Sequence, residues 1–146
     1  MNERYKVVKP EQVSEAKKLA VEKVKYWHDK LQPDVIFLAE CSGTPAGYLF
    51  KETWRNIYPK ESPPKFYRID PISTWQALGR EREKSHTDKP VLKRFNKFLS
   101  KRLPHGKDTK VIVYDVNVDS HRTEDAIKEI FIDYAGINPK SFSFEL

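Results

Sequence analysis

Apolar residues recur at the spacing of an amphipathic helix over the first part of the chain. The stripe begins after Pro10, a residue that a first helical turn tolerates, and Pro33 ends it. Its members are Val13, Ala16, Leu19, Ala20, Val24, Trp27 and Leu31. Because Trp27 lies on the apolar stripe, we expect its indole to belong to the core or to an interface rather than to a base-stacking platform.

Further along the chain, short apolar runs alternate with helical stripes. The short runs are typical of buried strands, and they lie at 34–39, 66–69, 111–114 and 142–144. Helical spacing recurs at 45–57, 91–103 and 123–135. Gly136 is suited to cap the last of these helices. The polar stretch 70–89 shows no clear period, so we expect a long loop there.

Strands that alternate with helices predict an α/β fold, in which a mostly parallel sheet is flanked by helices in a Rossmann-like core. The chain has 146 residues, the common size of one domain. We therefore expect a single domain over 1–146, with an N-terminal helical region at 1–33 and the core at 34–146.

Composition excludes several classes of protein. A single cysteine excludes a disulfide framework and a cysteine-rich zinc site, and the four histidines do not have metal-ligand spacing. No apolar run approaches the roughly 20 residues of a membrane span, and the N-terminus lacks the apolar segment of a signal peptide. We expect a soluble, cytoplasmic protein with no membrane partner.

The positive charge is concentrated in one segment. The chain carries a net charge of +6, and residues 80–110 hold eleven Lys or Arg against four Asp or Glu. Two interpretations stay open. The segment is the solvated face of an amphipathic helix, or it is a surface for phosphates, nucleic acid or an acidic partner.

Two strand–helix junctions carry the candidate chemistry, at 40–47 and at 114–123. In open parallel sheets ligands bind beyond the carboxyl ends of the strands, and a helix N-terminus offers backbone N–H groups to a phosphate. At the second junction, carboxylates would accept ribose hydroxyls or hold a hydrated Mg²⁺, and hydroxyls would donate to phosphate. The alternative is purely structural, since Asp and Ser commonly fill turns and cap helices.

The segment 111–123 resembles the PRPP-binding motif of type I phosphoribosyltransferases. That motif is an apolar run, two adjacent acids, two mostly apolar residues, and then an acid, Thr, Gly, any residue and Thr. Asp115 stands at the first acid, and Asp119 stands at the later acid, which in the purine enzymes is a candidate general base. The resemblance implies a ribose- and phosphate-binding segment made of Asp115, Asp119, Ser120, His121, Arg122 and Thr123.

The upstream segment 34–48 looks like the first strand and the pyrophosphate loop of the same family, so the resemblance covers roughly 34–146. It implies a pyrophosphate loop with Cys41, Ser42, Gly43 and Thr44. It also implies Mg²⁺ as the cofactor, with Asp115 reaching the metal through water or through the ligand. The family's flexible loop falls at 70–90, where the basic residues are Arg80, Arg82 and Lys84.

The chain departs from the family pattern at several positions. Val116 replaces the second acid, His121 replaces a Gly, and no Lys or Arg lies between residues 40 and 47. The chain also ends soon after its last predicted strand, so we expect little sequence there for a hood over an acceptor base, and the alternative is a hood supplied by 1–33. These departures favour binding of the ligand over efficient phosphoribosyl transfer.

The sequence therefore predicts a phosphoribosyltransferase-like domain that binds PRPP or a related ribose phosphate or nucleotide, with phosphoribosyl transfer as the reaction if it is an enzyme. We expect the basic segment 80–110 to form the loop and helix beside that site, where it attracts the anionic ligand. The alternatives are a non-catalytic module of the same fold that binds nucleic acid or an acidic partner through 80–110, and a regulatory nucleotide sensor.

Overall fold

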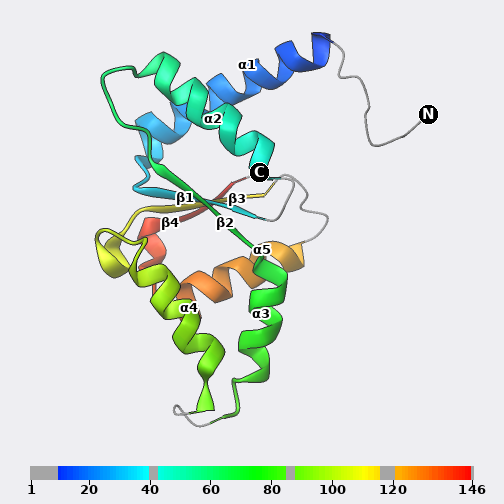
Figure 1. Ribbon diagram of the computed structural model, residues 1–146, viewed down its shortest axis with the longest axis vertical. Coiled ribbons are helices and arrows are strands. Elements are labelled where there is room, and N and C mark those ends of the chain that lie inside the picture. Colours follow the sequence, from blue (N-terminus) through cyan, green and yellow to red (C-terminus); the bar gives the residue numbers. More distant parts are fainter. Residues whose placement is uncertain (1–9, 40–42, 85–87, 116–120, 146) are drawn as a thin grey trace, which may run out of the picture.

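A four-stranded parallel sheet forms the middle layer of the protein (Figure 1). The computed structural model describes residues 10–39, 43–84, 88–115 and 121–145. The strands are β1 (Val35–Ala39), β2 (Lys65–Ile69), β3 (Val111–Tyr114) and β4 (Phe142–Glu145). Their order across the sheet is β2-β1-β3-β4, and every neighbouring pair is parallel. The predicted α/β fold with a mostly parallel sheet is confirmed.

Helices cover both faces of the sheet. The α-helices are α1 (Pro10–Tyr26), α2 (Gly43–Ile57), α3 (Pro71–Arg80), α4 (Pro90–Ser100) and α5 (His121–Lys128). π-Helical turns continue α1 through η1 (Trp27–Leu31) and α5 through Glu129–Tyr134, and short 3₁₀ turns lie at Gly106–Asp108 and Pro139–Ser141. In Figure 1, α1 and α2 lie on one face, and α3, α4 and α5 lie on the other.

The expectation of a long loop over 70–89 is wrong, because α3 occupies half of that segment. Asp70 caps the helix, since its Oδ1 accepts a hydrogen bond from the Ser73 amide at 3.2 Å, and Pro71 takes the first helical position. The apolar positions of α3 are few, but Leu78 is fully buried against the core. Polar composition concealed the helix, although an Asp–Pro start is a recognised signal for one.

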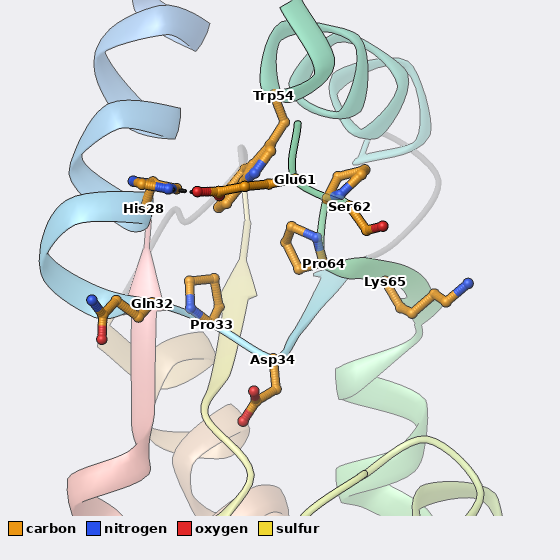
Figure 2. Close-up of a pocket in the computed structure, with 10 residues that line it drawn as sticks. His28, Gln32, Pro33, Asp34, Trp54, Glu61, Ser62, Pro64 and Lys65 are labelled. Atoms are coloured by element: carbon orange, nitrogen blue, oxygen red, sulfur yellow. Dashed lines mark hydrogen bonds and ion pairs between the residues drawn. The ribbon is translucent and has the colours of Figure 1, made fainter. Parts of the chain in front are cut away.

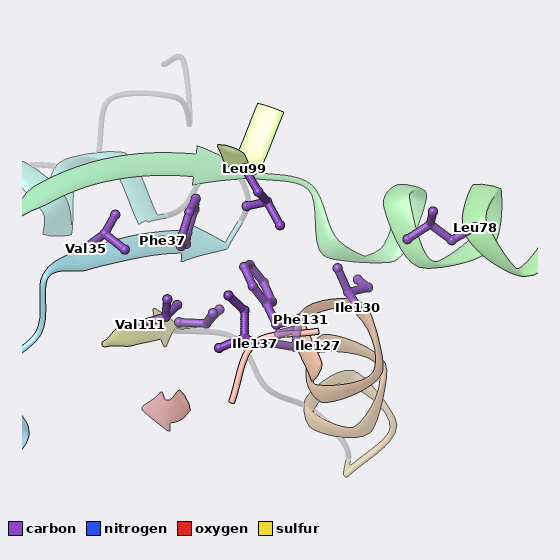
Figure 3. Close-up of a cluster of buried hydrophobic side chains, with 10 residues drawn as sticks. Val35, Phe37, Leu78, Leu99, Val111, Ile127, Ile130, Phe131 and Ile137 are labelled. Atoms are coloured by element: carbon purple, nitrogen blue, oxygen red, sulfur yellow. The ribbon is translucent and has the colours of Figure 1, made fainter. Parts of the chain in front are cut away.

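Alternation along the strands divides the core into two clusters. On the α3–α5 face, Phe37 packs against Phe131 with ring centroids 5.2 Å apart (Figure 3). On the α1–α2 face, Trp27 lies edge-on to Phe50 at 4.9 Å and is fully buried. Trp27 is thus a core residue, as its place on the apolar stripe predicted. The N-terminal part of that stripe is not buried, since Val13 is 40% and Leu19 50% exposed.

Two glycines set local geometry. A Cβ built on Gly47 would overlap Cδ1 of Leu38, so the missing side chain lets α2 pack closely against β1. Gly136 has φ of 74°, a left-handed conformation that favours glycine, and its amide donates to the carbonyl of Ile132 at 3.0 Å. The predicted role of Gly136 as a helix cap is confirmed.

Candidate functional site

The strand order brings the two predicted motif segments together. β1 and β3 are neighbours, and in register Leu38 lies beside Tyr114. The chain leaves β1 for α2 on one face of the sheet and leaves β3 for α5 on the other (Figure 1). A change of direction between adjacent parallel strands opens a crevice at their carboxyl ends, and ligands of open α/β sheets bind in that crevice. The carboxyl ends of β1 and β3 are therefore the candidate site.

Among the residues predicted for the two strand–helix junctions, Asp115 has a side chain that the structure describes. It follows β3 directly, and it is 5% exposed. Its amide donates to the carbonyl of Glu145 at 3.0 Å, which ties the end of β3 to the end of β4. A buried carboxylate at the carboxyl edge has the location that the sequence analysis predicted for a ribose or Mg²⁺ contact.

Tyr114, the residue before Asp115, has a carboxylate and a lysine as neighbours: Glu145 is its partner in register, and Lys23 lies over its ring. Burial raises the pKa of Glu145, although the positive charge of Lys23 acts to lower it. Burial, reinforced by the charge of Asp115, raises the pKa of the Tyr114 phenol. The Lys23 ammonium lies 5.7 Å from the centroid of the Tyr114 ring. α1 thus contributes a cation beside the β3–β4 end of this edge.

The other predicted site residues are described in part or not at all. Cys41, Ser42, Asp119 and Ser120 lie outside the described residues, as does Val116. Only the backbone is described at Gly43, Thr44, His121, Arg122 and Thr123. That backbone is helical from Gly43 and from His121, so α2 and α5 both begin inside the predicted motifs. Their first backbone amides belong to the carboxyl edge.

The basic segment does not flank this edge, and that expectation is wrong. α3 begins beside the end of β2 and runs away from the sheet, and α4 runs back toward the start of β3 (Figure 1). Lys110 directly precedes β3, and its amide donates to Oδ2 of Asp34 at 2.8 Å. The later half of the segment 80–110 therefore lies at the amino edge of the sheet.

The three basic residues assigned to a flexible loop have other surroundings. Arg80 ends α3, and Lys84 lies in the turn that follows. Arg82 forms an ion pair with Glu129, and its Nε donates to the hydroxyl of Tyr134 at 3.3 Å. Arg82 therefore connects the end of α3 to the α5 region.

Basic residues from other elements do lie at the carboxyl edge. Arg68 is in register with Leu38, which is in register with Tyr114, and Tyr114 with Glu145. This row crosses the whole sheet one residue before Ala39, the end of β1. Sequence reasoning missed Arg68, because only the strand register shows that it shares a row with the motif strands.

A cavity lies at the opposite, amino edge. It has a volume of about 510 Å³ and is lined by the η1–β1 connection, by Trp54 of α2 and by the α2–β2 connection (Figure 2). His28 lies between two carboxylates there, with Nδ1 2.8 Å from Asp29 Oδ1 and Nε2 2.8 Å from Glu61 Oε2. Its ring stacks on Tyr58 with centroids 3.6 Å apart. None of the predicted site residues that the structure describes lines this cavity.

Within the described residues, no group of three or more His, Cys, Asp or Glu side chains has an arrangement that would hold a metal ion. No helix in the same part of the chain combines the length and the apolarity that a membrane span requires.

Comparison of the chain with protein-family models, with curated proteins and with solved structures found no match.

Proposed function

We propose that the protein binds a ribose phosphate such as PRPP, or a related nucleotide, at the carboxyl ends of β1 and β3. The observation that carries the proposal is the strand order, which makes the two motif strands adjacent and parallel. The motifs are separated by about seventy residues of sequence, yet both follow strands that end at the same level. This edge is also the one at which α/β sheets of this kind bind ligands.

In this proposal each end of the ligand has its own partners. The N-termini of α2 and α5 present backbone amides and the positive ends of their dipoles, which favour phosphate. The buried carboxylate of Asp115 accepts hydrogen bonds from ribose hydroxyls. The resemblance assigns Asp119 the role of general base if the protein transfers the phosphoribosyl group.

Magnesium enters the proposal through the ligand. Asp115 lies at the carboxyl edge of the sheet but supplies a single carboxylate. The described residues contain no cluster of ligands that would hold a metal ion by protein side chains alone. A Mg²⁺ ion held mainly by diphosphate oxygens needs few protein ligands, and it usually keeps several waters. When bound, such an ion would neutralise the diphosphate, and Asp115 would contact it through water.

Calorimetric titration with PRPP and Mg²⁺ tests the proposal. We expect saturable binding to the wild-type protein, and a loss of at least about tenfold in affinity in Asp115→Asn and in Asp119→Asn, because each removes a charged hydrogen-bond acceptor. Asp133→Asn is a matched control, since Asp133 lies in the π-helical turn after α5. The absence of binding to the wild type, or equal affinities in all four proteins, would refute the proposal.

The exposed basic face of α4 supports a second candidate function, which is binding of nucleic acid. Lys93, Arg94 and Lys97 are exposed, while Leu99 of the same helix is buried. Electrostatic binding to nucleic acid weakens steeply with salt. Fluorescence anisotropy with single- and double-stranded DNA and RNA at low salt tests this function, and the absence of any binding there would exclude it.

A further inference from the structure

A small cavity lies between α2 and β2, next to the proposed site. Its volume is about 220 Å³, and Tyr48, Lys51 and Arg68 line it together with the apolar side chains of Leu38 and Phe66. That volume equals about seven molecules of liquid water. Complete pockets for small ligands measure about 300–1,000 Å³. The cavity therefore has room for one group of a ligand rather than for a whole ligand.

The charged residues that line the cavity are cationic. Lys51 and Arg68 face it, and no carboxylate does so among the described residues. Within that part of the chain, the Lys51 ammonium has no hydrogen bond or ion pair, and Lys51 as a residue is partly buried. Tyr48 is 75% exposed and adds a phenol that donates a hydrogen bond. Two cations and a donor around a small cavity favour an anionic group.

The cavity has a fixed place relative to Asp115. Arg68 ends its row on β2, Leu38 lies on β1, and Asp115 follows β3. Neighbouring strands are about 4.8 Å apart, so β2 lies about 10 Å from β3. The cavity at the β2 end of this edge is thus lined by cations, with the α3 cap Asp70 directly after β2, and the carboxylates of Asp115 and Glu145 belong to the β3–β4 end. A ligand that matches this edge carries hydroxyls at one end and an anionic group about 10 Å away.

We propose that Tyr48, Lys51 and Arg68 form a subsite for the diphosphate group of the ligand, while its hydroxyl-bearing part lies beside Asp115. The inference rests on the proposed function and assigns residues outside both motifs. The Arg68 guanidinium suits two parallel hydrogen bonds to phosphate oxygens, and Lys51 supplies a point charge. These cations take the place of the Lys or Arg that the segment 40–47 lacks.

Titrations with three probes test this subsite: PRPP with Mg²⁺, ribose 5-phosphate, and inorganic pyrophosphate. The test variant is Lys51→Gln with Arg68→Gln, and the matched control is Lys60→Gln with Lys65→Gln, which removes the same charge from exposed lysines nearby. We expect the test variant to lose about 100-fold in affinity for PRPP and to bind pyrophosphate at least tenfold more weakly. Affinity for ribose 5-phosphate should change less than threefold, as should all affinities of the control.

The results separate the two proposals. If PRPP binds and the test variant binds it as tightly as the control does, the subsite is refuted and the proposed function stands. If pyrophosphate binds through Lys51 and Arg68 while PRPP and ribose 5-phosphate do not bind, the subsite stands and the proposed function is refuted. If no probe binds to the wild type, both are refuted. Arg68→Lys, which keeps the charge but loses the two parallel hydrogen bonds, should bind pyrophosphate more weakly than the wild type and more tightly than the test variant.

Discussion

At the scale of single residues, Gly47 controls how closely α2 approaches β1. A Cβ at this position would overlap Cδ1 of Leu38, a side chain that is itself 4% exposed. The start of α2 would therefore have to move away from the strand, or Leu38 would have to change its rotamer. This contact fixes the position of the helix whose N-terminus belongs to the candidate site.

We expect Gly47→Ala to destabilise the protein by about 1–3 kcal/mol, because it overpacks a buried contact. Urea unfolding measures the effect, and Gly79→Ala is the matched control, since a Cβ on Gly79 meets no atom within 4 Å. In a Leu38→Ala background the effect of Gly47→Ala should shrink, because the clash is gone. Strictly additive effects of the two substitutions would contradict this account.

His28 makes the folded state sensitive to pH. The hydrogen bond to Asp29 is the largest influence that raises its pKa above 6.5, burial acts against it, and Glu61 raises the pKa further. A raised pKa means that the folded state favours the protonated ring. The resulting stabilisation is complete below the unfolded pKa of about 6.5, and it is lost as the pH rises through the higher folded pKa.

We therefore expect His28→Gln to lower the melting temperature at pH 6 by more than it does at pH 8.5. His105→Gln is the control, since His105 is 64% exposed and lies 3.7 Å from Asp34, its partner in the ion pair. Thermal unfolding from pH 5.5 to 8.5 measures both. If His28→Gln lowers the melting temperature by the same amount at every pH in this range, the contacts of His28 with Asp29 and Glu61 do not favour the charged ring.

At the scale of elements, Glu81 attaches the start of α4 to the end of α3. Its carboxylate oxygens accept hydrogen bonds from the amides of Val91 at 2.9 Å and Leu92 at 3.0 Å. Burial acts to raise the pKa of Glu81, but these two amides and the charges of Lys84 and Arg94 lower it overall. Stabilisation from Glu81 is therefore present above its unfolded pKa and is lost as the pH falls through the folded pKa.

We expect Glu81→Gln to lower the melting temperature by about 3–6 °C at pH 7, as the loss of a helix cap does in a domain of this size. Glu83→Gln, at an exposed position two residues away, should have little effect. Differential scanning calorimetry at pH 7 and pH 3.5 compares them. The melting temperatures of the two variants should differ less at pH 3.5 than at pH 7. An equal difference at both pH values would contradict the role of the ionised Glu81 as the acceptor for the α4 amides.

Sequence patterns predicted most of the elements, because the apolar runs are short and bounded. Val111–Tyr114 is four apolar or aromatic residues between polar ones, and it is a buried central strand. The helix α3 was missed, since Ser73, Thr74 and Gly79 weaken its periodicity. Strand order and register could not be predicted, and they decide that Arg68 and Glu145 belong to the same edge as Asp115.

At the scale of the whole molecule, the distribution of charge differs from what the linear sequence suggested. The basic segment 80–110 ends at the amino edge, whereas the candidate ligand site lies at the carboxyl edge. Ligand binding should therefore depend little on α4.

We expect Lys93→Gln with Lys97→Gln to change the affinity for PRPP less than twofold at 0.15 M salt, where charges separated by more than about 8 Å are screened. A tenfold loss would show that α4 contributes to the site.

Mapping the binding of PRPP and Mg²⁺ by amide NMR tests the central claim most directly, because it reports both binding and its location. We expect the largest chemical-shift changes on titration at the carboxyl edge, at the amides of Ala39, Gly43, Asp115, His121 and Glu145. Amides of the amino-edge cavity, at Gln32, Ser62 and Lys65, should change little. Shift changes confined to the amino edge, or no changes at saturating ligand, would contradict the account.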